Sequence, residues 1–136
     1  MCKGADLYIG GERLTWLDIP NSVKKLVDYA FQHCLSVERV TTGLALESVG
    51  SFAFTNCKNL KDVTFSTSIN AIGYGAFSGC DGLESATFNG SLTWFVTTSE
   101  EDFKNKTNGT QMDVSNAAQN ATYLKDTYAD YYWYAV

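Results

Sequence analysis

The strongest constraint on the fold of this chain is a phrase that recurs every 23 residues. Its clearest copy runs from Ala53 to Phe65 and reads Ala-Phe-Thr-Asn-Cys-Lys-Asn-Leu-Lys-Asp-Val-Thr-Phe. Three copies are marked by Cys34, Cys57 and Cys80, and no residue is inserted or deleted between them. A fixed period of roughly 20 to 50 residues indicates a solenoid built from stacked supersecondary units. We therefore expect successive copies to pack on one another in a single domain.

Each repeat has three parts. In the first part, apolar Val63 and Phe65 alternate with polar Asp62 and Thr64, which predicts a short strand with one buried face. A turn leads to a short apolar-Ile-Gly piece, and the Ala-Phe-x-x-Cys piece then has the i, i+3 spacing of a helical turn. Stacking at about 4.8 Å would join the apolar sides into a continuous core. The expected core ladders are Phe31/Phe54/Phe77, Val40/Val63/Ala86 and Val49/Ile72/Phe95.

The two ends of the chain depart from the repeat. Gly10-Gly11 separates two apolar stretches, residues 7–9 and 12–19, and this pattern predicts a hairpin whose second strand is also the first repeat's strand. We predict one domain over residues 1–136. Its expected parts are an N-terminal hairpin or cap (1–13), repeats of 23 residues (14–93) and a C-terminal cap (94–136).

The expected C-terminal cap would cover apolar side chains and strand edges at the end of the solenoid. Its helix would be capped by Asp113 or Ser115, and its aromatic tail, residues 131–134, would pack on the last repeat. The expected elements are strands at 94–98 and 109–114, a polar loop at 100–108 between them, and a helix at about 116–128.

Bulk composition excludes several function classes. The chain is 45% hydrophobic and 18% charged, as in globular proteins. Its net charge of −5 argues against nucleic-acid binding, which needs a basic face. No apolar run approaches the roughly 18 residues of a membrane span. No basic start precedes an apolar signal core, so we expect any targeting segment to lie outside this chain.

The cysteine ladder admits three interpretations: a metal site, a disulfide or buried free thiols. Structural zinc takes four tetrahedral ligands, whereas Cys34, Cys57 and Cys80 form a row with only His33 nearby. Parallel side chains in neighbouring repeats also give poor disulfide dihedral angles. We expect all four cysteines, Cys2 included, to be free thiols. No nucleophile, base and orienting acid come together in the sequence, so we predict no catalytic residue, metal or cofactor.

The outward positions of the predicted strands are the candidate partner-binding residues. Thr41, Thr64 and Thr87 recur at the 23-residue step, which suits any exposed strand but also a polar recognition face. A threonine array can suggest ice binding, but one threonine per repeat over three repeats is a small array with charged neighbours. A second candidate is the C-terminal aromatic cluster, residues 128–134, if part of it is exposed. The predicted binding residues are Trp16, Asp18, Arg39, Thr41, Asp62, Thr64, Ser85 and Thr87.

The repeat Ile-Gly-x-x-Ala-Phe-x-x-Cys-x-x-Leu-x-x-Val-x-Phe resembles the BspA-like leucine-rich repeat family of bacterial surface proteins. The resemblance covers about residues 14–92, and the departures are Val27, Thr42 and Ala86 at positions where other copies have Gly, Phe and Val. It implies the α/β class and a right-handed leucine-rich-repeat solenoid of about four rungs. One short strand per rung, the N-terminal hairpin and a C-terminal strand-plus-helix cap complete the expected fold.

The resemblance also implies a function. Such proteins are secreted or lie at the cell surface, and they act by binding, in some members by adhesion to host extracellular matrix or cell-surface proteins. The expected function is therefore non-catalytic, adhesin-like protein binding in an extracellular or cell-surface location. Two alternatives stay open: a structural spacer or scaffold with no ligand of its own, and an enzyme of unrecognised type.

Overall fold

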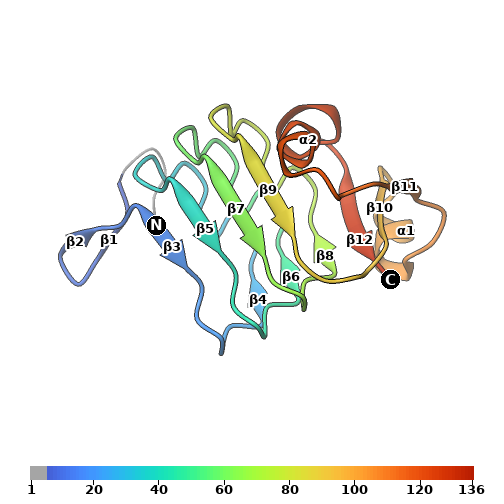
Figure 1. Cartoon of the computed structure of the whole chain (residues 1–136), viewed down its shortest axis with the longest axis horizontal. Helices are drawn as coiled ribbons and strands as arrows, with labels where there is room; N and C mark the ends of the chain where they lie inside the picture. Colours follow the sequence, from blue (N-terminus) through green and yellow to red (C-terminus); the bar gives the residue numbers. More distant parts are fainter. Residues whose placement is uncertain (1–5) are drawn as a thin grey trace.

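The 23-residue repeat corresponds to one turn of a β-solenoid (Figure 1). The structure, a computed structural model, describes residues 6–136. The repeats contain strands and turns, and the helices lie in the C-terminal cap. The expected solenoid with an N-terminal hairpin and a C-terminal cap is confirmed. In three of the turns the structure adds a second short strand to the one expected, because the apolar-Ile-Gly pieces also pair with one another.

The first sheet contains the strand predicted for each repeat. Its four strands run parallel and in register, so that Leu17, Val40, Val63 and Ala86 occupy equivalent inward positions. All four side chains are buried, and this predicted ladder is therefore confirmed for its three core members. In order, the strands are β3 (Trp16–Asp18), β5 (Arg39–Thr41), β7 (Asp62–Phe65) and β9 (Ser85–Phe88).

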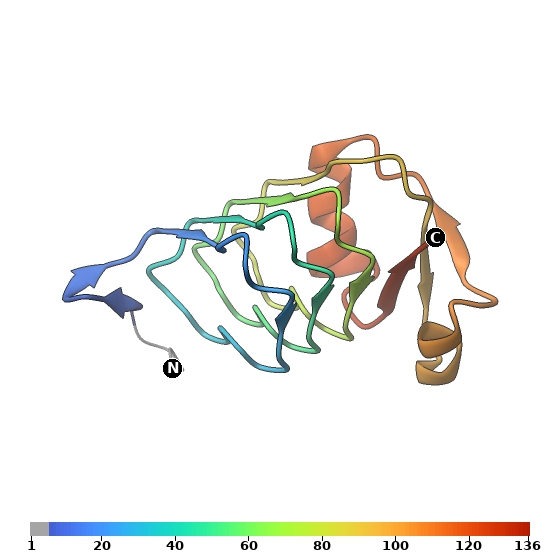
Figure 2. The same cartoon turned by 90° about the horizontal axis from the view of Figure 1, so that it is seen from below.

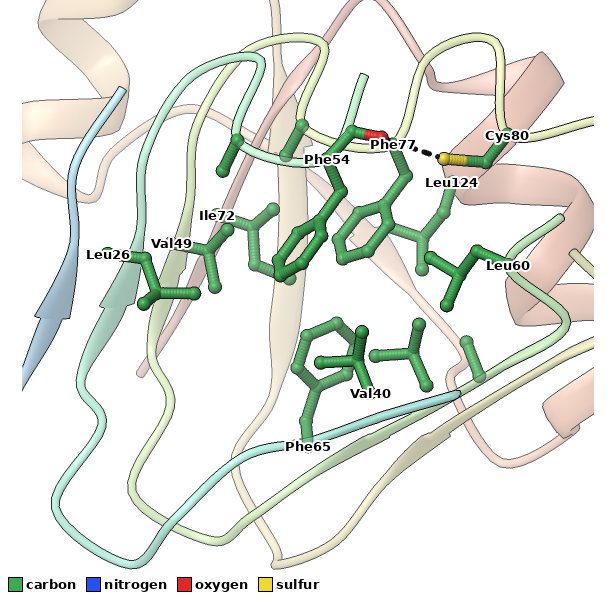
Figure 3. Packing of buried hydrophobic residues seen from close by; sticks show 14 of the residues in the cluster. Leu26, Val40, Val49, Phe54, Leu60, Phe65, Ile72, Phe77, Cys80 and Leu124 are labelled. Atoms are coloured by element: carbon green, nitrogen blue, oxygen red, sulfur yellow. Dashed lines mark hydrogen bonds between the residues drawn. The ribbon is translucent and has the colours of Figure 1, made fainter. Parts of the chain in front are cut away.

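The second sheet lies on the other side of the core. Its solenoid strands also pair in parallel, and each contributes one buried side chain, Leu26, Val49 or Ile72. Between the two sheets, the ring of Phe54 stacks on Phe77 at a centroid distance of 5.3 Å (Figure 3). The strands are β4 (Lys25–Leu26), β6 (Ser48–Val49) and β8 (Ala71–Ile72).

The N-terminal hairpin forms around the predicted glycines. Strands β1 (Tyr8–Ile9) and β2 (Glu12–Arg13) pair antiparallel, and Gly10 and Gly11 have φ angles of 61° and 84°. Positive φ at both central residues is what a two-residue hairpin turn requires. The second hairpin strand ends at Arg13 instead of continuing into β3, which is a difference from the predicted single strand over residues 12–19.

The C-terminal cap extends the second sheet. Strand β12 (Tyr132–Ala135) pairs antiparallel with β8, and β10 (Trp94–Thr97) and β11 (Thr110–Met112) follow in the order β8-β12-β10-β11. Trp133 is therefore the residue opposite Ile72, and it stacks on Phe88 with a centroid distance of 5.9 Å. The predicted Val49/Ile72/Phe95 ladder is wrong at its third member, because β12 inserts between β8 and the strand that carries Phe95.

The predicted polar loop contains a helix, α1 (Glu100–Asn105). Ser99 Oγ caps it by accepting a hydrogen bond from the Asp102 backbone N–H at 3.1 Å. Its first turn is acidic, which complements the positive N-terminal end of the helix dipole. The loop prediction is wrong for this segment. The helix buries none of its residues, so its sequence lacks an apolar face, and the N-cap and the acidic first turn were the only helix signals.

The predicted long helix starts as an α-helix, α2 (Ala117–Thr122), and continues as a π-helix, η1 (Tyr123–Thr127). Asn116, not Asp113 or Ser115, is its N-cap, and Asn116 Oδ1 accepts a hydrogen bond from Gln119 N–H at 2.9 Å. Asp113 instead accepts two hydrogen bonds from Ser115. Figure 1 shows α2 beside β9 at the end of the first sheet.

Candidate protein-binding face

The predicted binding residues come together on the outward face of the sheet β3-β5-β7-β9. Parallel register places one side chain from each strand in line along the solenoid, and we call the surface formed by these eight residues the strand face. Its first row is Trp16, Arg39, Asp62 and Ser85, and its second row is Asp18, Thr41, Thr64 and Thr87.

The first row is linked from strand to strand. The guanidinium of Arg39 lies over the ring of Trp16, 5.4 Å from the ring centroid. Arg39 Nε also lies 3.9 Å from Asp62 Oδ2, and Ser85 Oγ donates a hydrogen bond of 2.6 Å to Asp62 Oδ1. These contacts reduce the rotamer freedom of the row, so a partner would have to order fewer side chains on binding.

The second row is ordered at its N-terminal side. Thr41 Oγ1 donates a hydrogen bond of 2.7 Å to Asp18 Oδ1 and accepts one of 3.2 Å from the indole N–H of Trp16. These three side chains tie the two rows together. Thr64 and Thr87 are half-buried, and their hydroxyls make no side-chain hydrogen bond to any residue between 6 and 136.

The strand face combines an indole, one guanidinium, two carboxylates and several hydroxyls. Trp16 is 50% exposed, which is unusual for a large aromatic side chain on a strand. Exposed Trp and Arg beside polar groups are typical of binding surfaces. The arrangement offers hydrogen-bond donors and acceptors to a partner.

A groove on the second sheet was missed by the sequence analysis. It has a volume of about 380 Å³ and lies between the outward positions of β4, β6 and β8 and the helix α1. Phe103 and Tyr132 stack at 4.8 Å along one wall, and Lys25 and Ser48 lie on the sheet side. The signal was available, because Lys25, Ser48 and Ala71 also recur at the 23-residue step.

The buried thiols have a structural role. Cys57 Sγ donates to the carbonyl oxygen of Phe31 at 3.1 Å, and Cys80 Sγ donates to that of Phe54 at 3.0 Å, so each thiol contacts the preceding turn. Burial raises the pKa of Cys57 to about 11 and that of Cys80 still further. Both side chains are therefore neutral thiols at pH 7 and poor nucleophiles.

The expectation of free thiols holds for Cys57 and Cys80 and is wrong for Cys34. Cys57 and Cys80 are free, whereas Cys34 is disulfide-bonded. Cys2 lies outside the described residues. The prediction of free thiols was based on the poor disulfide dihedral angles between cysteines in neighbouring turns. It fails at Cys34 because it considered no other kind of cysteine pair.

His33 occupies a corner position of the solenoid. It has a φ of 57°, and the equivalent residues Asn56 and Gly79 also have positive φ, 57° and 76°. His33 Nε2 and Asn56 Nδ2 lie 3.1 Å apart. His33 therefore belongs to a row of equivalent corner residues that stack on one another. At Gly79 a Cβ atom would clash with Asn56 Oδ1, so a glycine fits there.

Over residues 6–136, no three His, Cys, Asp or Glu side chains lie close enough to hold a metal ion.

The C-terminal aromatic cluster packs mainly as cap core. Trp133 and Tyr134 are buried, and the other three tyrosines are half-buried. Tyr128 contacts both Tyr123 and Tyr131, with centroid distances of 5.3 and 5.0 Å.

Searched over its described part, the chain has no helix long and apolar enough to cross a membrane.

The fold and the strand face define a class of protein, a solenoid of short repeats with a capped C-terminal end. Residues 5–125 match the family described as the BspA type leucine rich repeat region, in six copies. The chain belongs to this family, and the resemblance found in the sequence is confirmed. The family and its fold are generally non-catalytic and serve as protein-interaction modules.

This chain is similar to a solved structure. It is the crystal structure of a leucine rich cell surface protein from Faecalibacterium prausnitzii A2-165, and it is 34% identical with a TM-score of 0.51. The match covers 52% of this chain and 19% of that chain, so the matched part spans about a fifth of the length of the neighbour. No curated protein matches this chain.

Proposed function

We propose that this chain is a non-catalytic, adhesin-like protein-binding module that acts in the extracellular space or at a cell surface. The observation that carries the proposal is the strand face. Its side chains stand in register on four strands, and Trp16, Arg39, Asp62 and Ser85 are already connected in the absence of a partner. Preorganised rows on a solenoid suit the recognition of a folded protein surface.

Two further observations support the location. The similar solved structure is described as that of a cell surface protein. The disulfide at Cys34 fits an oxidising compartment, because disulfides persist outside the cytoplasm and are rare within it. Host extracellular matrix and cell-surface proteins are accordingly the partners to test first.

A structural spacer is the alternative function. The regular Thr41/Thr64/Thr87 ladder would also suit an inert exposed sheet. A spacer would tolerate substitutions over the whole strand face without any change in binding. An enzyme is the less favoured alternative, because the two free thiols are buried and protonated.

An array of extracellular matrix and cell-surface proteins would test the proposal. The purified chain is expected to bind at least one of them. The double variant Arg39→Ala/Asp62→Ala should weaken that binding at least about tenfold, because it removes the charged centre of the strand face. The melting temperature should change little, because Arg39 is exposed and Asp62 only half-buried.

A matched pair of substitutions would locate the binding surface. Thr64→Lys and Ser48→Lys both change a half-buried outward residue of a strand, the first on the strand face and the second in the groove beside α1. Binding should be lost in Thr64→Lys and retained in Ser48→Lys. The opposite result would move recognition to the groove, and a complete absence of binding partners would favour the spacer.

A further inference from the structure

The chain contains two Asn-Gly pairs, Asn89-Gly90 and Asn108-Gly109. An asparagine that precedes glycine readily loses its side-chain amide, because glycine has no Cβ to keep its nitrogen away from the asparagine side chain and adopts backbone angles that other residues disfavour. The reaction needs a backbone N–H of the glycine that is free to react and an asparagine side chain that can rotate onto it. The two pairs differ in both respects.

The first pair lies at the end of the first sheet. Asn89 directly follows β9, and its backbone N–H donates to the carbonyl of Phe65 at 3.1 Å. The next backbone hydrogen bonds of the connection are those between Thr93 and Val136. Residues 90–92 are exposed and make no backbone hydrogen bond to any residue between 6 and 136. Figures 1 and 2 show this connection leading from β9 to the C-terminal cap.

Both reacting groups of the first pair are accessible. Over the described part of the chain, the backbone N–H of Gly90 has no acceptor, and the side-chain amide of Asn89 makes no hydrogen bond. Both residues are exposed, and Gly90 has a φ of 101°. The Asn89 side chain can therefore rotate without breaking a contact, and the backbone after it has the freedom that only glycine provides.

The equivalent position of the preceding turn is occupied differently. There the pair is Ser66-Thr67, at the same 23-residue step from Asn89-Gly90. Ser66 is buried, and its hydroxyl donates to the carbonyl of Gly43 at 2.7 Å. A serine has no side-chain carbonyl for a backbone nitrogen to attack. The reactive pair thus belongs to the last turn, where the chain leaves the solenoid for the cap.

The second pair is held by hydrogen bonds at both reacting groups. The backbone N–H of Gly109 donates to the phenolic oxygen of Tyr134 at 2.7 Å, and Nδ2 of Asn108 donates to Oδ1 of Asp102 at 3.0 Å. Attack by the Gly109 nitrogen would break the first bond. Release of the Asn108 amide would break the second bond and would create a new carboxylate beside that of Asp102, where like charges repel.

We propose that Asn89 is a modification site at which the folded chain deamidates spontaneously, whereas Asn108 is protected by the fold. The Gly90 nitrogen forms a bond to Cγ of Asn89 and gives up its proton, and the bond from Cγ to Nδ2 breaks with release of ammonia. Solvent water then opens the cyclic imide at either of its two carbonyls. The products are aspartate and isoaspartate in place of Asn89, and water is the only co-reactant.

The modification changes charge and backbone length at a defined place. A carboxylate with an ordinary pKa is ionised at pH 7, so the net charge of −5 becomes more negative by one unit. The new charge lies two residues after Thr87 of the strand face. Isoaspartate also adds one methylene group to the backbone between β9 and the cap. The age of the chain is thereby recorded beside the strand face, and this inference does not depend on the proposed binding function.

Incubation of the folded chain at neutral pH and physiological temperature would test the proposal. Anion-exchange chromatography follows the acidic product, and mass spectrometry of tryptic peptides locates it, because Asn89 and Asn108 lie in different peptides, 62–104 and 107–125. Asn89 should convert at least about tenfold faster than Asn108, whose two hydrogen bonds must first open. Equal rates in the folded chain would overturn the proposal, as would an Asn89 that does not convert.

The same incubation in concentrated urea is the first control. Both pairs should then react at similar rates, because their difference is assigned to the folded structure. A difference of the same size in urea would overturn the proposal, since it would arise from the local sequence alone.

Two variants provide the matched comparison. Asn89→Ser, which introduces the residue of the preceding turn, should abolish the acidic product from peptide 62–104. Tyr134→Phe keeps a ring to stack on Phe95 but removes the acceptor for the Gly109 N–H. In this variant Asn108 should convert about two- to tenfold faster while the rate at Asn89 stays the same. An unchanged rate at Asn108 would overturn the protection that is assigned to Tyr134.

Discussion

At the scale of the residue, the recurring cysteine is explained by packing and by one hydrogen bond. A thiol fits the small space between turns and donates its proton to a carbonyl of the preceding turn, as Cys80 does to Phe54 (Figure 3). A methyl group in this place would fill part of the volume but would leave out the donor. At Cys57 and Cys80 the thiol therefore connects neighbouring turns through a hydrogen bond, whereas Cys34 at the equivalent position is disulfide-bonded.

The buried thiols predict a loss of stability at alkaline pH. The pKa of Cys57 is raised from 9.0 to about 11 in the folded chain, so the folded state holds this proton more tightly than the unfolded state. The contribution is complete below pH 9 and is lost as the pH rises toward 11, at up to about 1.4 kcal/mol per pH unit. Denaturant unfolding at pH 8, 9 and 10 would measure it.

The control is the variant Cys57→Ala/Cys80→Ala, in which the lysines and tyrosines still titrate. Its stability at pH 8 should be lower than that of the unaltered chain, but its decline toward pH 10 should be shallower. Parallel declines in the two proteins would show that the thiols do not contribute to the pH dependence.

At the scale of the element, the cap depends on one buried amide. Asn120 in α2 is fully buried, and its Nδ2 donates to the carbonyls of Ala86 and Val114 at 2.9 and 2.8 Å. These bonds satisfy a carbonyl of β9 at the edge of the first sheet, where the solenoid has no further strand. The amide thereby supplies a hydrogen-bond donor to β9 where a further strand would otherwise pair with it.

Asn120→Ala should destabilise the protein by about 2 to 3 kcal/mol, because it removes hydrogen bonds from the buried carbonyl of Ala86 and the partly buried carbonyl of Val114 and leaves a small cavity. Asn105→Ala, at the exposed end of α1, is the matched control and should cost less than about 0.5 kcal/mol. Chemical denaturation of both variants would provide the comparison. Equal costs would show that α2 is not attached to β9 through Asn120.

The elements differ in how far the sequence predicts them. The strands of the first sheet follow from the period and the alternation, and the hairpin follows from Gly10-Gly11. Helix α1 was predictable from Ser99 and the acidic turn after it, but its lack of an apolar face concealed it. The insertion of β12 beside β8 was not predictable, because pairing between segments about 60 residues apart leaves no local pattern.

At the scale of the whole molecule, the chain is a stack in which each turn contacts only its neighbours. The period therefore predicted the strand face and the core ladders within the repeats, but not where the Val49/Ile72 ladder continues into the cap. It could not predict the groove beside α1, which combines residues of the repeat with residues of the cap.

Substitution of equivalent phenylalanines in the stack should lower the free energy of unfolding by unequal amounts. Phe54 is 1% exposed and has an aromatic ring on both sides, whereas Phe31 in the first turn stacks on one side and is half-buried. Phe54→Ala should cost about 3 to 5 kcal/mol, and Phe31→Ala about half as much, because less of its ring is buried. Denaturant unfolding would measure both. A cost below about 1 kcal/mol for Phe54→Ala, or equal costs at the two positions, would contradict a core built from stacked turns in which Phe31 is the less buried of the two.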